Sequence, residues 1–86
     1  MQRQVLGALV FVALSSTGVP ARDRPVTDDE RARLAAAVAA QGCSGGKMEF
    51  DIDDQHFEVD DARCSDGRKY DLKFDTSFRM IRKKLD

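Results

Sequence analysis

Hydrophobic and acidic residues alternate through much of the second half of this 86-residue chain. A period of two is typical of a strand that buries one face and exposes the other. The apolar positions with this period form three runs: Met48, Phe50 and Ile52; Phe57 and Val59; and Tyr70, Leu72 and Phe74. The pattern therefore predicts three half-buried strands, which short connections would make antiparallel.

The connection between the first two runs sets an expected register. A two-residue turn at residues 54–55 would place Ile52 opposite Phe57. The same register places Phe50 opposite Val59, so that one face of the hairpin is wholly apolar. Such a face can pack against a helix.

The second connection and the C-terminal segment are less determined. Asp66-Gly67 predicts a turn into the third strand. The residues leave open whether Val59 pairs with Leu72 or with Phe74. Residues 78–85 have apolar positions at helical spacing but follow a Thr-Ser turn, so helix and strand both remain open. We favour a fourth strand, because its basic residues would suit an exposed sheet edge.

A helix is expected before the strands. Thr27 and Glu30 have the spacing of a capping box, and Gly42 is placed to end the helix in a left-handed conformation. Leu34 and Val38 lie four residues apart and share a narrow face of otherwise small side chains. The expected fold is therefore α+β, with one N-terminal helix packed on a three- to four-stranded antiparallel sheet.

The N-terminal residues have the pattern of an export signal. Arg3 precedes an apolar run at residues 5–14, and small residues around Ala21 suit cleavage after that position. We expect a signal peptide at residues 1–21, a flexible leader at 22–26, and a folded domain at 27–86. The apolar run is too short to span a bilayer, so we expect a periplasmic or secreted protein without stable membrane insertion after cleavage.

Cys43 and Cys64 are the two cysteines of the chain. In the register above, Cys64 lies opposite position 45, so both thiols reach the same end of the hairpin. Small exported domains most often oxidise such a pair, and we expect a structural disulfide. A redox role is disfavoured because the chain has no Cys-x-x-Cys spacing. A metal site formed by the two cysteines and His56 is disfavoured because His56 lies at the opposite end of the hairpin.

Charge is placed unevenly, although the formal net charge is only −1. This balance argues against nucleic acid as a partner. The expected register sets four acids outward, with Asp51 opposite Glu58 and Glu49 opposite Asp60, and such like-charge pairs are destabilising. Lys69 and Lys73 on the third strand would relieve part of the repulsion. The strip could instead receive a cationic partner surface or a hard cation such as calcium.

Catalytic chemistry is not indicated by the sequence. His56 is the single histidine, and we expect it to be a solvated residue near a turn. The serines at positions 44, 65 and 77 have no base at any spacing that we can identify. We therefore expect a protein that is not an enzyme and that has no cofactor, no catalytic residues and no metal ligands.

The layout resembles the small exported PepSY-domain proteins of bacteria. The resemblance rests on the helix, on the pair Gly45-Gly46 before the first strand, and on the run DGRKYDLKFD at residues 66–75. It covers roughly Val26 to Asp86. One position departs from the family pattern, because Phe78 stands where the family usually has a turn glycine. The resemblance implies a noncatalytic exported module that binds or inhibits peptidases or acts in envelope signalling.

Two functions from different classes follow. The first is a periplasmic interaction module that binds an envelope protein, with a peptidase as one candidate, through the residues Glu49, Asp51, Glu58 and Asp60. The alternative is a small envelope protein that binds a divalent cation on the same acidic face. A homodimer through the basic edge strand is a third, structural option. The residues leave open the partner and the oligomeric state.

Overall fold

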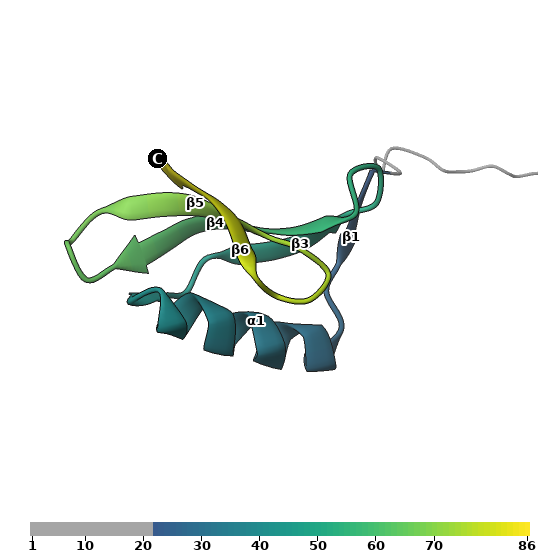
Figure 1. The fold of residues 1–86 in the computed structure, drawn as a ribbon, viewed down its shortest axis with the longest axis horizontal. Coiled ribbons are helices and arrows are strands. Elements are labelled where there is room, and N and C mark those ends of the chain that lie inside the picture. Colours follow the sequence, from purple (N-terminus) through teal and green to yellow (C-terminus); the bar gives the residue numbers. More distant parts are fainter. Residues whose placement is uncertain (1–21) are drawn as a thin grey trace, which may run out of the picture.

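The computed structural model describes residues 22–86. The export signal expected at residues 1–21 lies outside the described residues. Within residues 22–86 the chain forms one helix and six strands (Figure 1). In chain order these are β1 (Asp23–Pro25), α1 (Asp28–Ala40), β2 (Cys43–Ser44), β3 (Lys47–Asp51), β4 (His56–Cys64), β5 (Lys69–Phe74) and β6 (Met80–Leu85).

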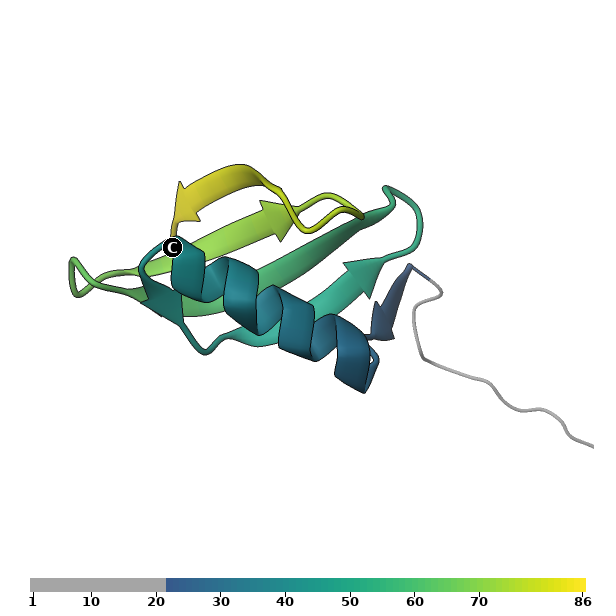
Figure 2. The ribbon, with the colours of Figure 1, turned by 60° about the horizontal axis from the view of Figure 1, so that its bottom comes forward.

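The strands form a single antiparallel sheet with one helix on it. The strand order is β1-β3-β4-β5-β6, and β2 pairs with β4 beside β3. Helix α1 lies across one face of this sheet (Figure 2), which leaves the other face without a covering element among the described residues. The expected α+β architecture is confirmed. The expected count of three to four strands was too low, because β1 and β2 are additional.

Strand β1 replaces the flexible leader that was expected at residues 22–26. Arg24 pairs with Phe50 of β3, and its guanidinium lies 4.4 Å from the centre of the Phe50 ring. Two guanidinium nitrogens of Arg24 each donate a hydrogen bond of 2.9 Å to Glu30 of the helix. These bonds, with that from the Thr27 amide, lower the pKa of Glu30 to about 2. Strand β1 therefore precedes the helix in the chain. Its Arg24 contacts both the sheet, at Phe50, and the helix, at Glu30.

Helix α1 has the ends that its sequence predicts. The Thr27 hydroxyl accepts a hydrogen bond from the Glu30 amide (3.1 Å), and the Glu30 carboxylate accepts one from the Thr27 amide (2.9 Å). This capping box satisfies two amides that would otherwise lack partners. Gly42 follows the helix with φ +74°. Leu34 and Val38 are the buried residues of the helix, as their spacing indicated.

The hydrophobic core lies between the helix and the inner face of the sheet. Phe74, Leu34, Leu72, Val38 and Val59 are its largest fully buried side chains. A core with so few large side chains is typical of small domains that also need a disulfide or a similar link for stability.

The first hairpin has a register that differs from the expected one. Residues 52–55 form a four-residue turn in place of a two-residue turn, and Phe50 therefore pairs with Phe57. The Asp54 amide donates to Asp51 Oδ1 (3.1 Å), and the Gln55 side chain donates to the Ile52 carbonyl (2.7 Å). Ile52 lies in the turn and is 41% exposed, so it is not a core residue. The register is shifted by two residues, which changes the cross-strand partners but leaves each side chain on the same face of the sheet.

A β-bulge in β4 decides which residues of its second half face the helix. Two residues of β4, Asp60 and Asp61, lie between the pairs Val59–Leu72 and Ala62–Tyr70, where β5 contributes only one. The register left open by the sequence is therefore Val59 with Leu72. The extra residue reverses the alternation along β4, so that Ala62 is buried.

Gly46 lies against this bulge and has a conformation that other residues rarely adopt. Its φ is +99°, and a Cβ atom there would lie 2.7 Å from Val59 Cγ1 and 2.9 Å from the Asp60 carbonyl oxygen. The glycine therefore allows the β2–β3 connection to approach β4 closely.

Replacing Gly46 with alanine is expected to lower the free energy of unfolding by about 2 kcal/mol, the combined effect of an unfavourable φ and overpacking. Gly45→Ala is the matched control, because Gly45 also has a positive φ (+70°) but no atom lies within 4 Å of its Cβ position. Its loss should be about 1 kcal/mol. Urea denaturation of the two variants measures the difference, and equal losses would show that the close contact is unimportant.

The disulfide expected between Cys43 and Cys64 is formed. The two residues are direct cross-strand partners in the pairing of β2 with β4, and both are buried. The expected register placed Cys64 opposite position 45, which was wrong by the same two residues as the rest of the hairpin.

The C-terminal segment forms strand β6, the fourth strand favoured by the sequence. The turn before it uses Phe78 in a left-handed conformation, with φ 64°, at the place where the resembled family has glycine. Asp75 accepts hydrogen bonds from the amides of Ser77 (2.9 Å) and Arg79 (3.0 Å), which holds the turn. The Phe78 ring stacks on Phe57 at a centroid distance of 5.0 Å, and this packing offsets the backbone cost.

No helix in the described part of the chain is long and apolar enough to cross a bilayer.

Candidate functional site

The sheet face opposite the helix, here called the outer face, holds the four acids singled out in the sequence. Glu49 and Asp51 belong to β3, and Glu58 and Asp60 belong to β4. In each strand they alternate with residues that face the helix, and all four are half-buried. The structure therefore places the four candidate partner-binding residues together on one surface.

Their pairing differs from the expected one. Glu49 lies directly opposite Glu58, Lys47 lies opposite Asp60, and Asp51 lies opposite His56. The expected pairs Asp51–Glu58 and Glu49–Asp60 are wrong because the turn has four residues. Within the first hairpin one like-charge pair, Glu49–Glu58, lies directly across the ladder, and Asp51 also lies opposite Asp23 of β1; such pairs are destabilising.

Neighbouring bases compensate this charge only in part. Lys47 Nζ lies 3.5 Å from Glu49, and Lys73 Nζ lies 4.0 Å from Glu58. Lys69, the other base expected to help, pairs in register with Arg63 beyond the bulge. Burial, and then the negative charges of neighbouring acids beginning with Asp71, raise the pKa of Asp60. The acidic part of the outer face thus retains an excess of negative charge.

A hollow of about 220 Å³ lies on the same face, over β4, β5 and β6. Its charged lining residues are of both signs: Glu58, Asp60 and Asp71, and Lys73, Arg82 and Lys84. The acids come mainly from β4 and the bases mainly from β6, so that the surface is acidic towards the first hairpin and basic towards the C-terminal edge. A surface with this division is complementary to a partner that carries a cationic group beside an anionic one.

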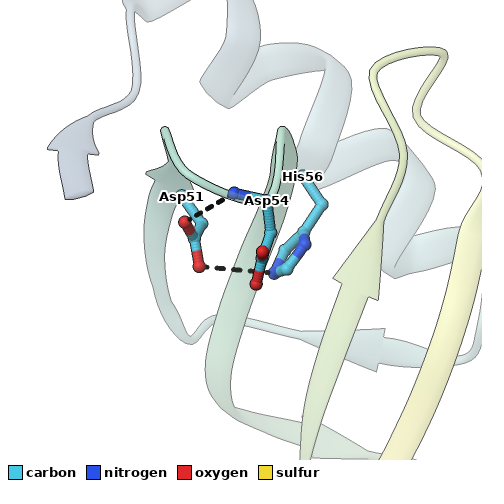
Figure 3. Close-up of side chains that lie close together, drawn as sticks. All are labelled: Asp51, Asp54 and His56. Atoms are coloured by element: carbon cyan, nitrogen blue, oxygen red, sulfur yellow. Dashed lines mark hydrogen bonds and ion pairs between the residues drawn. The ribbon is translucent and has the colours of Figure 1, made fainter. Parts of the chain in front are cut away.

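His56 is the functional candidate that sequence reasoning missed. It begins β4 and is only 7% exposed, although it was expected to be a solvated turn residue. Its Nε2 lies 3.0 Å from Glu58 Oε2 and 3.8 Å from Asp51 Oδ2. Figure 3 shows the imidazole beside the carboxylates of Asp51 and Asp54. The available signal was the alternation itself, because His56 has the same parity as Glu58 and Asp60.

Three groups of side chains among the described residues could hold a metal ion. In each group one ligand atom per residue lies within 4.8 Å of the others: Asp51, Asp54 and His56; Glu49, Glu58 and Asp60; and Asp61, Asp71 and Asp86. The first group includes an imidazole nitrogen, whereas the other two offer carboxylate oxygens alone. The two chemistries differ in the cations that they prefer.

Comparisons of this chain with protein-family models, with curated proteins and with solved structures give no match.

Proposed function

We propose that this protein is a noncatalytic exported module of the PepSY type, which binds a partner protein in the cell envelope through the acidic part of its outer face. The partner is a protein with a cationic surface segment, and a peptidase is one candidate. A buried disulfide supports export, because such bonds persist in oxidising compartments. No nucleic acid or cofactor enters this proposal.

The observation that carries the proposal is the Glu49–Glu58 pair. The two side chains are each 25% exposed and face each other across the ladder. The nearest lysines, Lys47 and Lys73, lie 3.5 and 4.0 Å away, so that hydrogen bonding from them is weak or absent, and the closer contact is that of His56 Nε2 with Glu58, at 3.0 Å. A cationic group from a partner would relieve a repulsion that the free protein sustains.

The fold leaves this surface available. Helix α1 occupies the opposite face, and no other described element crosses the outer face (Figure 1). The acids project from paired strands of one sheet, which keeps their spacing rigid. A rigid, pre-organised charge pattern selects among partners and speeds their encounter.

The test is affinity capture with the full chain, its disulfide intact, immobilised and exposed to an envelope extract of the cells that make it. The captured protein is then purified and its affinity is measured by titration calorimetry. The Glu49→Gln, Glu58→Gln double variant is expected to bind it at least tenfold more weakly and with a smaller dependence on salt.

The matched control is the Asp28→Asn, Asp29→Asn double variant. It removes the same charge from exposed positions at the start of α1, away from the outer face. Its affinity for the captured partner, measured at an ionic strength that screens distant charges, should stay within about twofold of the wild type. Equal losses in the two double variants, or the absence of any retained protein, would overturn the proposal.

A further inference from the structure

We propose that the tip of the first hairpin is a binding site for one zinc ion, held by His56, Asp51 and Asp54. This proposal does not depend on the protein-binding proposal, although the two share Asp51 and Glu58. It lies at the end of the sheet where β3 turns into β4, far along the hairpin from the disulfide.

The three side chains converge from three successive pieces of the chain. Asp51 ends β3, Asp54 belongs to the turn, and His56 begins β4. Their candidate ligand atoms lie within 4.8 Å of one another, and His56 Nε2 is 3.8 Å from Asp51 Oδ2. Ligand atoms about 3.3 Å apart surround a tetrahedral zinc ion with bonds of about 2.0–2.1 Å. Rotation of the exposed Asp54 side chain and a small shift of the imidazole towards Asp51 would close this difference.

The burial of His56 is the independent observation that points to a ligand. Its side chain is 9% exposed, yet it belongs to the polar face of β4 and its ring is directed among carboxylates (Figure 3). Burying an imidazole is costly unless its nitrogens are satisfied. Glu58 Oε2 lies 3.0 Å from Nε2, within hydrogen-bond distance. A divalent cation bound at Nε2 would bring two positive charges to an acidic cluster.

The backbone of the turn orients one of the ligands in advance. The Asp54 amide donates a hydrogen bond of 3.1 Å to Asp51 Oδ1, which leaves Oδ2 directed at the imidazole (Figure 3). Fixing one carboxylate oxygen so that the other can bind metal is a common outer-shell arrangement. The four-residue turn therefore has a geometric role in the site, since a two-residue turn would not place Asp54 in this position.

The donor set selects the class of cation. One imidazole nitrogen with two carboxylate oxygens suits zinc and related transition metals, and Glu58 is near enough to complete a fourth position. Calcium requires six to eight oxygen ligands, which the hairpin tip lacks. Occupancy by zinc would fix the turn and would add stability in proportion to the free metal concentration.

The test is titration calorimetry of the full chain, disulfide intact, with zinc chloride. The wild type is expected to bind one equivalent. His56→Gln and Asp54→Asn should each weaken binding at least tenfold, because each removes a ligand and even the loss of an outer-shell partner costs about 10–100-fold. Asp53→Asn is the matched control, because Asp53 is an exposed acid of the same turn that pairs with Arg22 outside the cluster. Its zinc affinity should be unchanged.

An NMR measurement separates zinc binding by His56 from a change in folding. The chain has one histidine, so the imidazole ¹⁵N resonances report His56 alone. Zinc should shift the Nε2 resonance strongly in the wild type and in Asp53→Asn, and equimolar calcium should leave it unchanged. An unshifted Nε2, tight binding by His56→Gln, or displacement of zinc by equimolar calcium would each overturn the proposal. Asp54→Asn changes only an exposed side chain, which keeps the test valid if His56→Gln fails to fold.

Discussion

Replacing Leu34 with alanine is expected to lower the free energy of unfolding by about 3–4 kcal/mol, within the range for buried leucines. Leu34 is fully buried, and Leu34 and Val38 are the two buried residues of the helix. Alanine is the best helix former, so the loss would report packing against the sheet and not helix propensity. Urea denaturation followed by circular dichroism measures it. In so small a domain, this loss is a large part of the total stability.

The matched control for this prediction is Leu85→Ala. It makes the same chemical change at a leucine that is 50% exposed on the edge strand β6. Less apolar surface is lost to water there, so we expect a loss below about 1 kcal/mol. A similar loss in the two variants would mean that α1 contributes little to the core, contrary to the structure.

Removal of the disulfide is the second large effect. The Cys43→Ala, Cys64→Ala double variant is expected to lose about 3 kcal/mol, because the bond closes a loop with a sequence separation of 21 residues. The bond also joins β2 to β4 directly after the C-terminal end of α1, so its loss should loosen that end of the helix. Urea midpoints of the wild type with and without a reductant measure the contribution.

The double variant supplies the control for that measurement. A reductant should lower the urea midpoint of the wild type towards that of the double variant and should leave the double variant itself unchanged. A wild-type midpoint insensitive to complete reduction would contradict the prediction, since it would show that the packed core alone holds the β2–β4 pairing.

The local elements were predictable because their causes are local. The capping box of Thr27 and Glu30 depends on residues three apart, and the structure contains both of its hydrogen bonds. The three alternating runs became β3, β4 and β5, since an alternating pattern can bury its apolar side only in a strand. Strand β1 was missed because a three-residue strand has too few positions to show a period, and Pro25 indicated a boundary.

The register was not predictable, because it depends on how turns and bulges are closed by hydrogen bonds. Two alternatives for the first turn differ by two residues and preserve the same apolar face, so hydrophobic patterning cannot separate them. The structure selects the longer turn, in which the Asp54 amide bonds to Asp51. The bulge after Val59 is likewise invisible as a pattern, although it decides that Ala62 is buried.

The candidate site shows the same division. The acidic residues of the outer face were found from alternation, but their partners were wrong, and the close pair is Glu49 with Glu58. His56 was judged from its nearness to a turn, whereas it is the buried first residue of β4, and the longer turn makes Asp51 its cross-strand partner in place of residue 53. Its role as a candidate ligand thus depends on the turn length.

The sequence by itself determined the helix, the three central strands, the inward and outward faces and the pairing of two cysteines, because each rests on propensity, period or composition. The tertiary structure alone decided the cross-strand partners, the added strands β1 and β2, and the convergence of Asp51, Asp54 and His56. These features depend on distances between residues separated by a turn or a layer. Such distances follow from the closure of the whole sheet, which no single segment encodes.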